Sequence, residues 1–393
     1  MDFSFLVTII ALLFSFFVVG ALLGAGFSKP IRKKLVKFLR LEQIQRLLLN
    51  RSFHNPILKP GTHPWTAEAV LNPAAITLDG RTHLIYRAIG MDGISRLGYA
   101  SSLDGIVFDR RLPNPSYVAQ NPRSAGWQTP SHMRRYSPAM YPSGGSWGGC
   151  EDPRMVVIDG RVYVTFNMFD GWDYIRVAAI SIPHDAFVGE RFDEWEGPYI
   201  LSKPGERHKN WVLFPEKIGG KFAIIHSIAP KIEIAYCDSI EAVGSEESFI
   251  ESWVGARNDL PIREDAWDSF IRSAGPPPVK TEHGWLLFYH AINERDPSRY
   301  QLGAMLLDLN DPTKVLYRAA APVLSPNEHY ENAGKPGIVY ACGAVVRDGT
   351  LFIYYGGADK VVCVATTPLD AFINALIDGS QPSLVEVLPT QTT

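Results

Sequence analysis

Residues 155–166 read Met155-Val156-Val157-Ile158-Asp159-Gly160-Arg161-Val162-Tyr163-Val164-Thr165-Phe166. Runs of β-branched and aromatic residues lie on both sides of an Asp-Gly pair, and such a pair tolerates the positive φ angles of a tight hairpin turn. The stretch therefore predicts two antiparallel strands that are joined by a two-residue turn.

The same pattern occurs at five places in the chain. Its turns end in glycines that are separated by roughly 60 to 80 residues, namely Gly80, Gly160, Gly220, Gly284 and Gly349. Strand candidates precede the turns at residues 73–76, 155–158, 216–218, 278–280 and 343–346, and a further strand candidate follows each hairpin. Five units of at least three strands predict an all-β chain that folds as a five-bladed β-propeller over residues 51–380. An irregular all-β sandwich is the alternative interpretation.

In a propeller, the first strand of each blade lines the central channel. The predicted openings of these strands are Asn72-Pro73, Asp152-Pro153, Pro215-Glu216, Gly275-Pro276-Pro277 and Cys342-Gly343. Polar residues beside proline are an unusual choice for a strand opening, so they indicate a functional site. The second strands end in Arg87, Asn167, His226, His290 and Tyr355, and Asp359 follows the last of them. The sequence therefore predicts one pocket that gathers acids, bases and amides around Asp152.

The composition limits the class of protein. Hydrophobic residues make up 46% and charged residues 20% of the 393 residues, which allows a large core. The net charge of -3 gives no reason to expect a nucleic-acid partner. The four cysteines lack the spacing of a metal site, so we predict free thiols and no bound metal at Cys150, Cys237, Cys342 and Cys363.

The N-terminal segment has a different character. Residues 3–27 contain no charged side chain, and about 20 apolar residues suffice to cross a bilayer. Lys and Arg residues follow this run rather than precede it, which favours an uncleaved anchor over a signal peptide. Because positive charge stays on the cytoplasmic side, the sequence predicts a single-pass membrane anchor over residues 1–28 with the catalytic domain on that side.

Residues 29–50 are predicted to form a basic juxtamembrane helix. Ile31, Leu35, Phe38 and Leu39 recur at helical spacing, with basic residues between them. Two interpretations stay open for this helix: it lies on an anionic leaflet, or it links the anchor to the domain and packs on the domain. Residues 381–393 are predicted to be a C-terminal tail.

A series of ordered motifs between about residues 55 and 365 resembles glycoside hydrolase family 130, the β-mannoside phosphorylases and β-mannosidases. The motifs are Asn72-Pro73-Ala74, Tyr86-Arg87-Ala88, Gly149-Cys150-Glu151-Asp152-Pro153-Arg154, Leu213-Phe214-Pro215-Glu216-Lys217, Gly275-Pro276-Pro277-Pro278, residues 284–290, residues 302–308, and Tyr354-Tyr355-Gly356-Gly357-Ala358-Asp359. The resemblance implies a five-bladed propeller, in agreement with the repeat count, and an enzyme that acts on β-mannosides.

The resemblance also implies a role for each residue of the predicted pocket. Asp152 is the implied general acid, which delivers a proton to the leaving oxygen of the glycosidic bond. The implied substrate-binding residues are Asn72, Arg87, Asp92, Glu151, Arg154, Asp359 and Tyr300, and the implied phosphate-binding residues are Lys209, Arg272 and His290. The implied reaction is inverting phosphorolysis of a β-mannoside oligosaccharide to α-mannose 1-phosphate and a shortened acceptor. Inorganic phosphate is then a co-substrate, and no cofactor is implied.

One departure from the family pattern keeps a second reaction open. Many phosphorylases of the family have an arginine after the histidine of the third blade, whereas this chain has Ser227 there. Lys209 and Lys231 could supply the missing charge, since a phosphate dianion needs several charge-assisted bonds. The alternative is an inverting β-mannosidase, in which Glu216 or Glu233 activates water. A cytoplasmic location favours phosphorolysis, because phosphate is plentiful there.

Two further classes of protein fit less well. A non-catalytic, membrane-tethered glycan-binding propeller would not need Asp152 together with Arg87 and Lys209. A furanosidase on another five-bladed propeller would need three separated carboxylates on three blades, and the predicted blade openings do not provide this set. The linkage that is cleaved, the acceptor sugar and the oligomeric state are not predicted.

Overall fold

Most of the chain that the structure describes is β-strand. The computed structural model describes residues 49–119, 146–171, 174–243, 263–264 and 266–379. Within these ranges, α-helix is limited to α3 (His184–Val188) and α4 (Leu369–Gly379). Single 3-10 turns are η1 (Pro64–Thr66), η4 (Phe192–Glu194) and η5 (His329–Glu331). The part of the chain that the structure describes is therefore mainly β-strand, which agrees with the predicted all-β class.

The ends of the chain are mostly outside these ranges. The predicted membrane anchor, residues 29–48 of the predicted basic helix and the predicted tail all lie outside the described residues. In the part of the chain that is described, no helix has the length and apolar character that a membrane span requires. The predicted basic helix includes Asn50, but Asn50 begins strand β1 (Asn50–Arg51), which pairs with β20 (Val361–Pro368). The β domain therefore begins at this residue.

The strands of the described ranges form five consecutive antiparallel groups. Group 1 contains β2 (Ala69–Leu78), β3 (Arg81–Ile89), β4 (Ile94–Ser102) and β5 (Arg110–Arg111). Group 2 contains β6 (Gly148–Ile158), β7 (Arg161–Asp170), β8 (Ile175–Pro183) and β9 (Glu196–Ile200). Group 3 contains β10 (Val212–Leu213), β11 (Phe222–Ser227) and β12 (Glu233–Cys237). Group 4 contains β13 (Phe270–Ala274), β14 (Val279–Thr281), β15 (Gly284–Asn293), β16 (Asp296–Leu307) and β17 (Val315–Arg318). Group 5 contains β18 (Val339–Arg347), β19 (Thr350–Gly357), β20 and β1.

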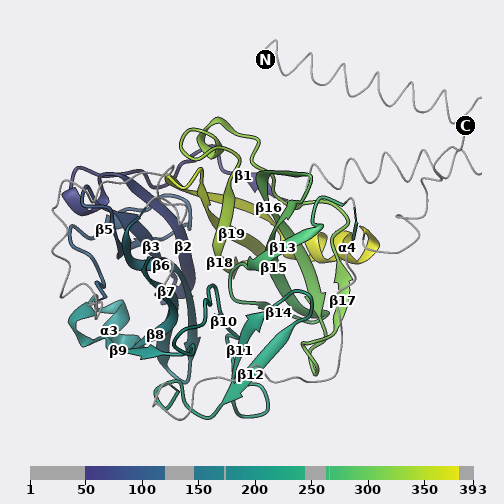
Figure 1. Ribbon diagram of the computed structural model, residues 1–393, viewed down its shortest axis with the longest axis horizontal. Helices are drawn as coiled ribbons and strands as arrows, with labels where there is room; N and C mark the ends of the chain where they lie inside the picture. Colours follow the sequence, from purple (N-terminus) through teal and green to yellow (C-terminus); the bar gives the residue numbers. More distant parts are fainter. Residues whose placement is uncertain (1–48, 120–145, 172–173, 244–262, 265, 380–393) are drawn as a thin grey trace, which may run out of the picture. The chain divides into compact units, whose positions relative to one another are not determined.

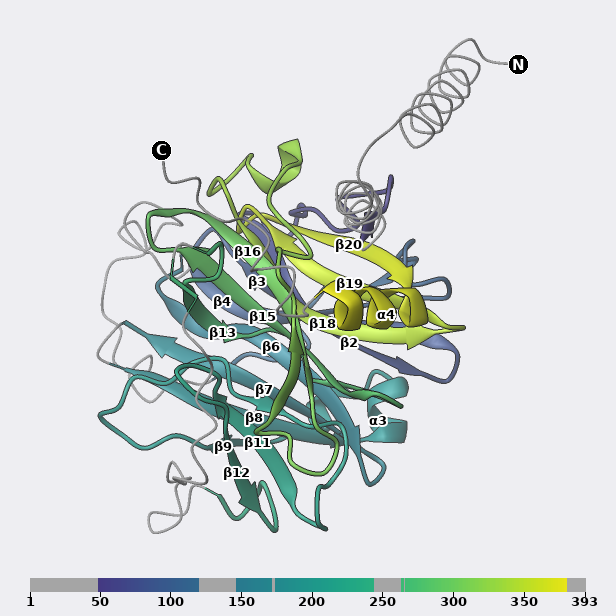
Figure 2. The ribbon, with the colours of Figure 1, turned by 90° about the vertical axis from the view of Figure 1, so that its right-hand side faces the viewer.

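These groups follow one another around a common centre, which gives the domain a propeller-like arrangement (Figure 1). Groups 1 and 2 are joined by a short parallel contact, in which Ile94 of β4 pairs with Gly148 of β6. The pairing of β1 with β20 places the first described strand in the last group. In Figure 2, α4 lies beside β18 and β19, and the ring of its Phe372 packs 5.7 Å from that of Phe288 in β15.

The hairpin turns confirm the sequence pattern at four of its five places. Both central residues of these turns have positive φ angles, between 47° and 81°, as a type I′ turn requires. The four turns are Asp79-Gly80, Asp159-Gly160, Gly219-Gly220 and Asp348-Gly349. The fifth differs, because its Gly284 has a φ of 143° and already belongs to β15.

The predicted strand openings are irregularities inside the first strands. β2 and β6 continue through Asn72-Pro73 and Asp152-Pro153, and the pairing register shifts at both places. β18 has a similar shift at Cys342. Proline cannot donate a ladder hydrogen bond, so a strand tolerates it at a bulge. The prediction that these residues open the strands is therefore wrong, although each lies in the first strand of its group.

Group 3 departs further from the prediction. Its first strand is β10, which pairs with β11, whereas residues 214–217 form no strand. Ile218 makes only an isolated bridge to Lys221 across the turn. The predicted strand over residues 216–218 is therefore wrong, since Pro215 cannot contribute to a ladder. In group 4, the prolines of residues 275–278 likewise separate β13 from β14.

The hydrophobic core lies between neighbouring groups. Ile85 of β3 belongs to the same buried cluster as Val164 and Phe166 of β7. Between groups 2 and 3, the rings of Tyr163 and Phe222 lie 5.3 Å apart. Burial of apolar surface stabilises by about 25 cal/mol per Å². These contacts therefore hold neighbouring groups together.

Candidate active site

Asp152 lies at the bulge of β6 in an uncommon backbone conformation. Its φ angle is 50°, and Asn72, at the corresponding bulge of β2, has a φ of 48°. Asp and Asn adopt this left-handed region more readily than other side chains do, but the conformation still costs energy. Residues held in such conformations cluster at functional sites. Neighbouring groups must therefore hold both residues in place.

Two donors hold the carboxylate of Asp152. The amide Nδ2 of Asn72 donates to its Oδ1 at 2.7 Å, and Nη1 of Arg87 donates to the same oxygen at 3.2 Å. Asp152 is only 7% exposed, and its burial alone would raise its pKa. The positive charges of Arg87, Lys209 and Arg154, with the hydrogen bond from Asn72, outweigh this effect and lower the pKa below its ordinary value. The site therefore holds Asp152 as a carboxylate.

Arg87 connects this carboxylate to a second one. Its Nη2 donates to Oε1 of Glu151 at 3.0 Å and to Oγ of Ser146 at 2.8 Å, and its Nε donates to Oγ of Ser95 at 2.9 Å. Lys209 pairs with the other oxygen of Glu151 at 2.7 Å. Arg87 and Glu151 are almost completely buried, at 1% and 0% exposed. Buried charges of this kind need partners with good geometry, and each of these has them.

Asp359 is a third buried acid of the site. It lies between β19 and β20 at a φ of 50°, and its Oδ2 lies 3.7 Å from Nζ of Lys335. Burial raises the pKa of Asp359, and the charges of Lys335 and Arg87 only partly oppose this. The pKa values of Asp152 and Asp359 are therefore shifted in opposite directions, which is common where two acids take different roles.

Close packing fixes the position of Asn72. Its Oδ1 lies against Gly356 of β19, and a Cβ atom at this glycine would be only 2.1 Å from that oxygen. Any larger residue at this position would displace Asn72 from Asp152. The glycine of the Tyr-Tyr-Gly-Gly motif is therefore explained by the close approach of β19 to the bulge of β2.

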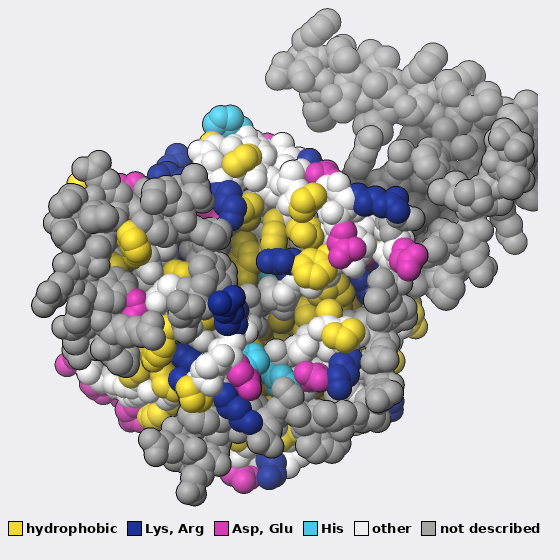
Figure 3. Space-filling view, viewed as in Figure 1, with side chains coloured by type: hydrophobic (Ala, Val, Ile, Leu, Met, Phe, Trp, Pro, Cys, Tyr) yellow, Lys and Arg dark blue, Asp and Glu magenta, His cyan; other side chains and the backbone are white. Residues whose placement is uncertain are grey.

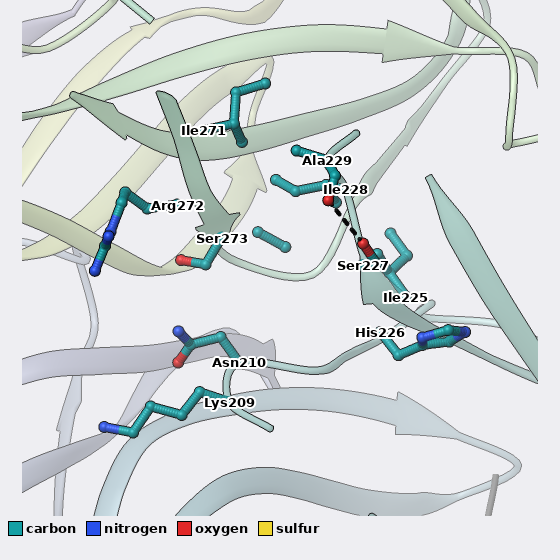
Figure 4. Close-up of a pocket in the computed structure, with 11 residues that line it drawn as sticks. Lys209, Asn210, Ile225, His226, Ser227, Ile228, Ala229, Ile271, Arg272 and Ser273 are labelled. Atoms are coloured by element: carbon teal, nitrogen blue, oxygen red, sulfur yellow. Dashed lines mark hydrogen bonds between the residues drawn. The ribbon is translucent and has the colours of Figure 1, made fainter. Parts of the chain in front are cut away.

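A small cavity of about 130 Å³ lies next to this cluster (Figure 4). Lys209 and Arg272 line it from different groups, and in Figure 4 both side chains extend to the same side of the cavity. The remaining lining residues are Asn210, Ile225, His226, Ser227, Ile228, Ala229, Ile271, Ser273 and Ala274. Within the described residues, this lining contains two cations and no carboxylate. Arg272 and Lys209, whose amine also pairs with Glu151 outside this lining, can both donate charge-assisted hydrogen bonds to a small anion.

A larger cavity of about 830 Å³ adjoins the small one, since Arg272 lines both. Tyr300 and Lys335 are also part of its lining. The face of the molecule in Figure 3 is hollowed near its centre, with Lys and Arg side chains around the hollow. A cavity of this size accommodates a ligand of several sugar units or a comparable molecule.

His290 and Asp92 do not lie where their predicted roles suggest. His290 is fully buried: its Nε2 accepts the backbone N–H of Ala341 at 2.9 Å, and its Nδ1 lies 3.1 Å from Oγ of Ser273. Burial and the charge of Arg154 lower the pKa of His290 to about 3, so it is neutral. Both nitrogens are occupied within the protein. Asp92 lies in the turn between β3 and β4, where it pairs with Arg96 at 2.6 Å.

Glu216, Glu233 and Lys231, which were considered for water activation or charge compensation, are not part of the lining of the small cavity. Glu216 pairs with Lys280 at 2.6 Å, with about half of each side chain exposed. Glu233 pairs with Lys231 at 2.9 Å and lies 3.7 Å from Nδ1 of His226, which lines the cavity, but neither Glu233 nor Lys231 is part of the lining. Lys231 therefore does not replace the missing arginine in this structure, whereas Lys209 is in place.

Two residues of the site were missed by the sequence analysis. Asn210 has a φ of 64°, lines the small cavity and accepts a hydrogen bond from Arg154 at 2.9 Å. Lys335 lies beside Asp359 and lines the larger cavity. Asn210 could have been found from its position next to Lys209. Lys335 belongs to a long connection before β18 that has no repeat pattern, so no sequence signal marks it.

Comparison with known proteins places this site in a family. The family model described as beta-1,4-mannooligosaccharide phosphorylase matches residues 134–377. A 1,2-beta-oligomannan phosphorylase from Thermoanaerobacter sp. is 38% identical over 330 residues, which cover 81% of this chain and 96% of that protein. A beta-1,2-mannobiose phosphorylase from the same organism is 32% identical over 332 residues, with coverages of 81% and 96%.

A solved structure agrees with the arrangement of the strand groups. The beta-1,2-mannobiose phosphorylase from Listeria innocua superposes with a TM-score of 0.62 at 24% identity, covering 84% of this chain and 99% of that chain. This likeness shows the fold. With the family match and the relatives above, it establishes that the chain belongs to glycoside hydrolase family 130.

Proposed function

We propose that this protein cleaves β-mannosides by inverting phosphorolysis, which yields α-mannose 1-phosphate and a shortened acceptor sugar. One observation favours phosphate over water as the nucleophile. The small cavity beside Asp152 is lined by Lys209 and Arg272 and, among the described residues, by no carboxylate. Hydrolysis with inversion needs a carboxylate that activates water. The relatives that are named as phosphorylases support the same choice.

In the proposed mechanism, mannose lies over Asp152, Asn72 and Asp359, and hydrogen phosphate lies in the small cavity. A phosphate oxygen attacks the anomeric carbon from the face opposite the leaving oxygen, so the configuration inverts. The bond to the acceptor breaks, and the acceptor oxygen takes up one proton. Hydrogen phosphate carries one proton, and the acceptor oxygen receives one proton in the products, so the reaction needs no proton stored on the enzyme. Asp152 starts as a carboxylate, in keeping with its lowered pKa, and it takes up and passes on the proton only while the bonds change.

We further propose that the five strand groups are the blades of a five-bladed propeller, with Asp152 near its axis. The support is the order of the groups and the pairing of β1 with β20. The larger cavity is proposed to hold the acceptor part of the oligosaccharide. Tyr300 lines that cavity, and burial raises its pKa to about 12, so it stays a neutral hydroxyl that can bond a sugar.

Arg272→Ala is expected to raise the KM for phosphate about 10- to 100-fold, because hydrogen bonds to charged groups contribute about 1.5–3 kcal/mol. The KM for the mannoside should rise by a smaller factor, because Arg272 is one of several residues that line the larger cavity. Initial rates at varied phosphate and fixed mannoside measure this effect. Arg299→Ala is the matched control, since Arg299 lines only the larger cavity. Equal effects of both substitutions on the phosphate KM would contradict the assignment of the small cavity.

We also propose that residues 1–28 anchor the enzyme in a membrane, with the catalytic domain on the cytoplasmic side. The support is the uncharged run of residues 3–27 and the basic residues that follow it. The full chain should sediment with membranes after a carbonate wash, and a chain that lacks residues 1–28 should stay in the supernatant. A full chain that is extracted by carbonate would contradict the anchor.

A further inference from the structure

Arg154 is a buried cation whose donors are fully used within the protein. It is 2% exposed and makes five hydrogen bonds with described residues. Nε donates to the carbonyl of Gly275 at 3.2 Å. Nη1 donates to the carbonyl of Asp152 at 2.7 Å and to Oδ1 of Asn210 at 2.9 Å. Nη2 donates to the hydroxyl of Tyr340 at 3.3 Å and to the carbonyl of Ala274 at 3.4 Å.

A guanidinium has five N–H donors, so each donor of Arg154 has an acceptor. The acceptors come from four different strand groups: Asp152 from β6 of group 2, Asn210 from the segment before β10 of group 3, Ala274 and Gly275 from group 4, and Tyr340 from β18 of group 5. A sugar or phosphate could reach this guanidinium only by displacing one of these bonds.

We propose that Arg154 is a positioning residue that ties four of the five strand groups together and fixes the backbone of Asp152, and that it does not bind substrate. The inference rests on the proposed function and explains how its reacting carboxylate is held. The shortest bond of Arg154 goes to the carbonyl of Asp152, a residue whose φ of 50° requires support from its surroundings.

The charge of Arg154 has a separate effect. All five acceptors are neutral carbonyl, amide or hydroxyl oxygens, so the positive charge acts on the carboxylate of Asp152 through space. Arg154→Lys keeps that charge but has only three donors on a compact ammonium group, which cannot span the same acceptors. The substitution therefore removes hydrogen bonds between strand groups and retains most of the electrostatic effect on the carboxylate of Asp152.

The kinetic constants of Arg154→Lys test this inference in the full-length enzyme. A displacement of the reacting carboxylate by about 1 Å can cost about 100-fold in rate, so kcat should fall by about that factor. The KM values for phosphate and for a β-1,2-mannooligosaccharide should stay within about twofold, because no substrate contact is lost. A higher KM for either substrate at unchanged kcat would overturn the inference and make Arg154 a ligand.

Two further variants keep the test decisive. Tyr340→Phe removes one acceptor and keeps the ring that stacks on His290 at 3.9 Å, so kcat should fall about 2- to 10-fold at constant KM. Unchanged kcat in this variant would contradict the proposed positioning role of Arg154.

Arg347→Lys is the matched control. Arg347 also donates to neutral oxygens of another group, at Thr82 and Leu103, but these bonds lie near the hairpin turns. It should keep the full kcat.

Thermal unfolding gives a result that does not depend on turnover. Arg154→Lys should lower the melting temperature by several degrees and by more than Arg347→Lys does. Equal melting temperatures of Arg154→Lys and the natural protein would contradict the tie between strand groups. A natural protein that melts normally and turns over no β-mannoside would instead contradict the proposed function.

Discussion

Asp152→Asn is expected to lower kcat about 1,000-fold, which is within the usual contribution of general acid–base catalysis. The variant should still fold, because Asn has the same shape and adopts the left-handed conformation of this position as readily as Asp. Arg87 would keep its bonds to Glu151 and Ser146. The measurement is the initial rate of β-mannoside cleavage at saturating phosphate, together with the melting temperature.

The choice of leaving group makes this test sharper. A nitrophenyl leaving group needs little protonation, so the loss of Asp152 should lower the cleavage rate much less with nitrophenyl β-mannoside than with a mannooligosaccharide.

Asp159→Asn is the matched control. Asp159 also has a φ of 50°, but its side chain is 66% exposed in a turn, where it pairs with Lys217. It should leave the rate unchanged. If Asp152→Asn kept a tenth or more of the natural rate on mannooligosaccharides, the assignment of the acid would fail.

Arg87→Met is expected to give the largest loss of stability. Arg87 is the cation between two buried carboxylates, and removal of one partner from a buried ion pair typically costs about 3–5 kcal/mol. Lys209 would still pair with Glu151, but Asp152 would keep only the hydrogen bond from Asn72 and more distant charges. Urea unfolding of both proteins near pH 7 measures the difference in the free energy of unfolding.

The pH dependence of that difference has a definite sign. In the natural protein, the lowered pKa of Asp152 contributes stability that is present at neutral pH and is lost as the pH falls through the folded-state value. Without Arg87, the burial that raises this pKa meets less opposing charge, so the ionised carboxylate becomes a cost at higher pH. The loss of stability should therefore be smaller near pH 5 than near pH 7.

A control identifies what is specific to the buried site. Arg81→Met breaks an ion pair with Asp109 in which both side chains are partly exposed, at 28% and 55%. Exposed pairs contribute about 0–1 kcal/mol, so this variant should lose little stability at either pH. A similar loss in Arg87→Met and Arg81→Met would show that the carboxylates do not depend on Arg87.

Local chemistry made much of the fold predictable from the sequence. Asp-Gly and Gly-Gly pairs tolerate the positive φ angles of a tight turn, so four hairpins could be placed where such a pair lies between two strand-like runs. The bulges could not be placed in this way, because the register shift at Asp152-Pro153 depends on how β6 pairs with β7. A polar-proline pair looks like a strand opening when only the sequence is known.

The site was predictable where a residue contacts Asp152 directly. Asp152, Asn72 and Arg87 come together as expected, from strands that the repeat pattern had identified. The surroundings of Arg154 were not predictable, because its acceptors range from residue 152 to residue 340 and four of the five are recognised only in three dimensions. The burial of His290 could not be predicted for the same reason, since its partners Ser273 and Ala341 lie on other strands.

The product formed from a β-1,2-mannooligosaccharide with and without inorganic phosphate tests phosphorolysis most directly. The full-length enzyme would be incubated under both conditions, and phosphorus NMR and sugar chromatography would identify the products. We predict α-mannose 1-phosphate and a shortened oligosaccharide in equal amounts, formed only when phosphate is present. Free mannose released at the same rate without phosphate would contradict phosphorolysis and the assignment of the small cavity.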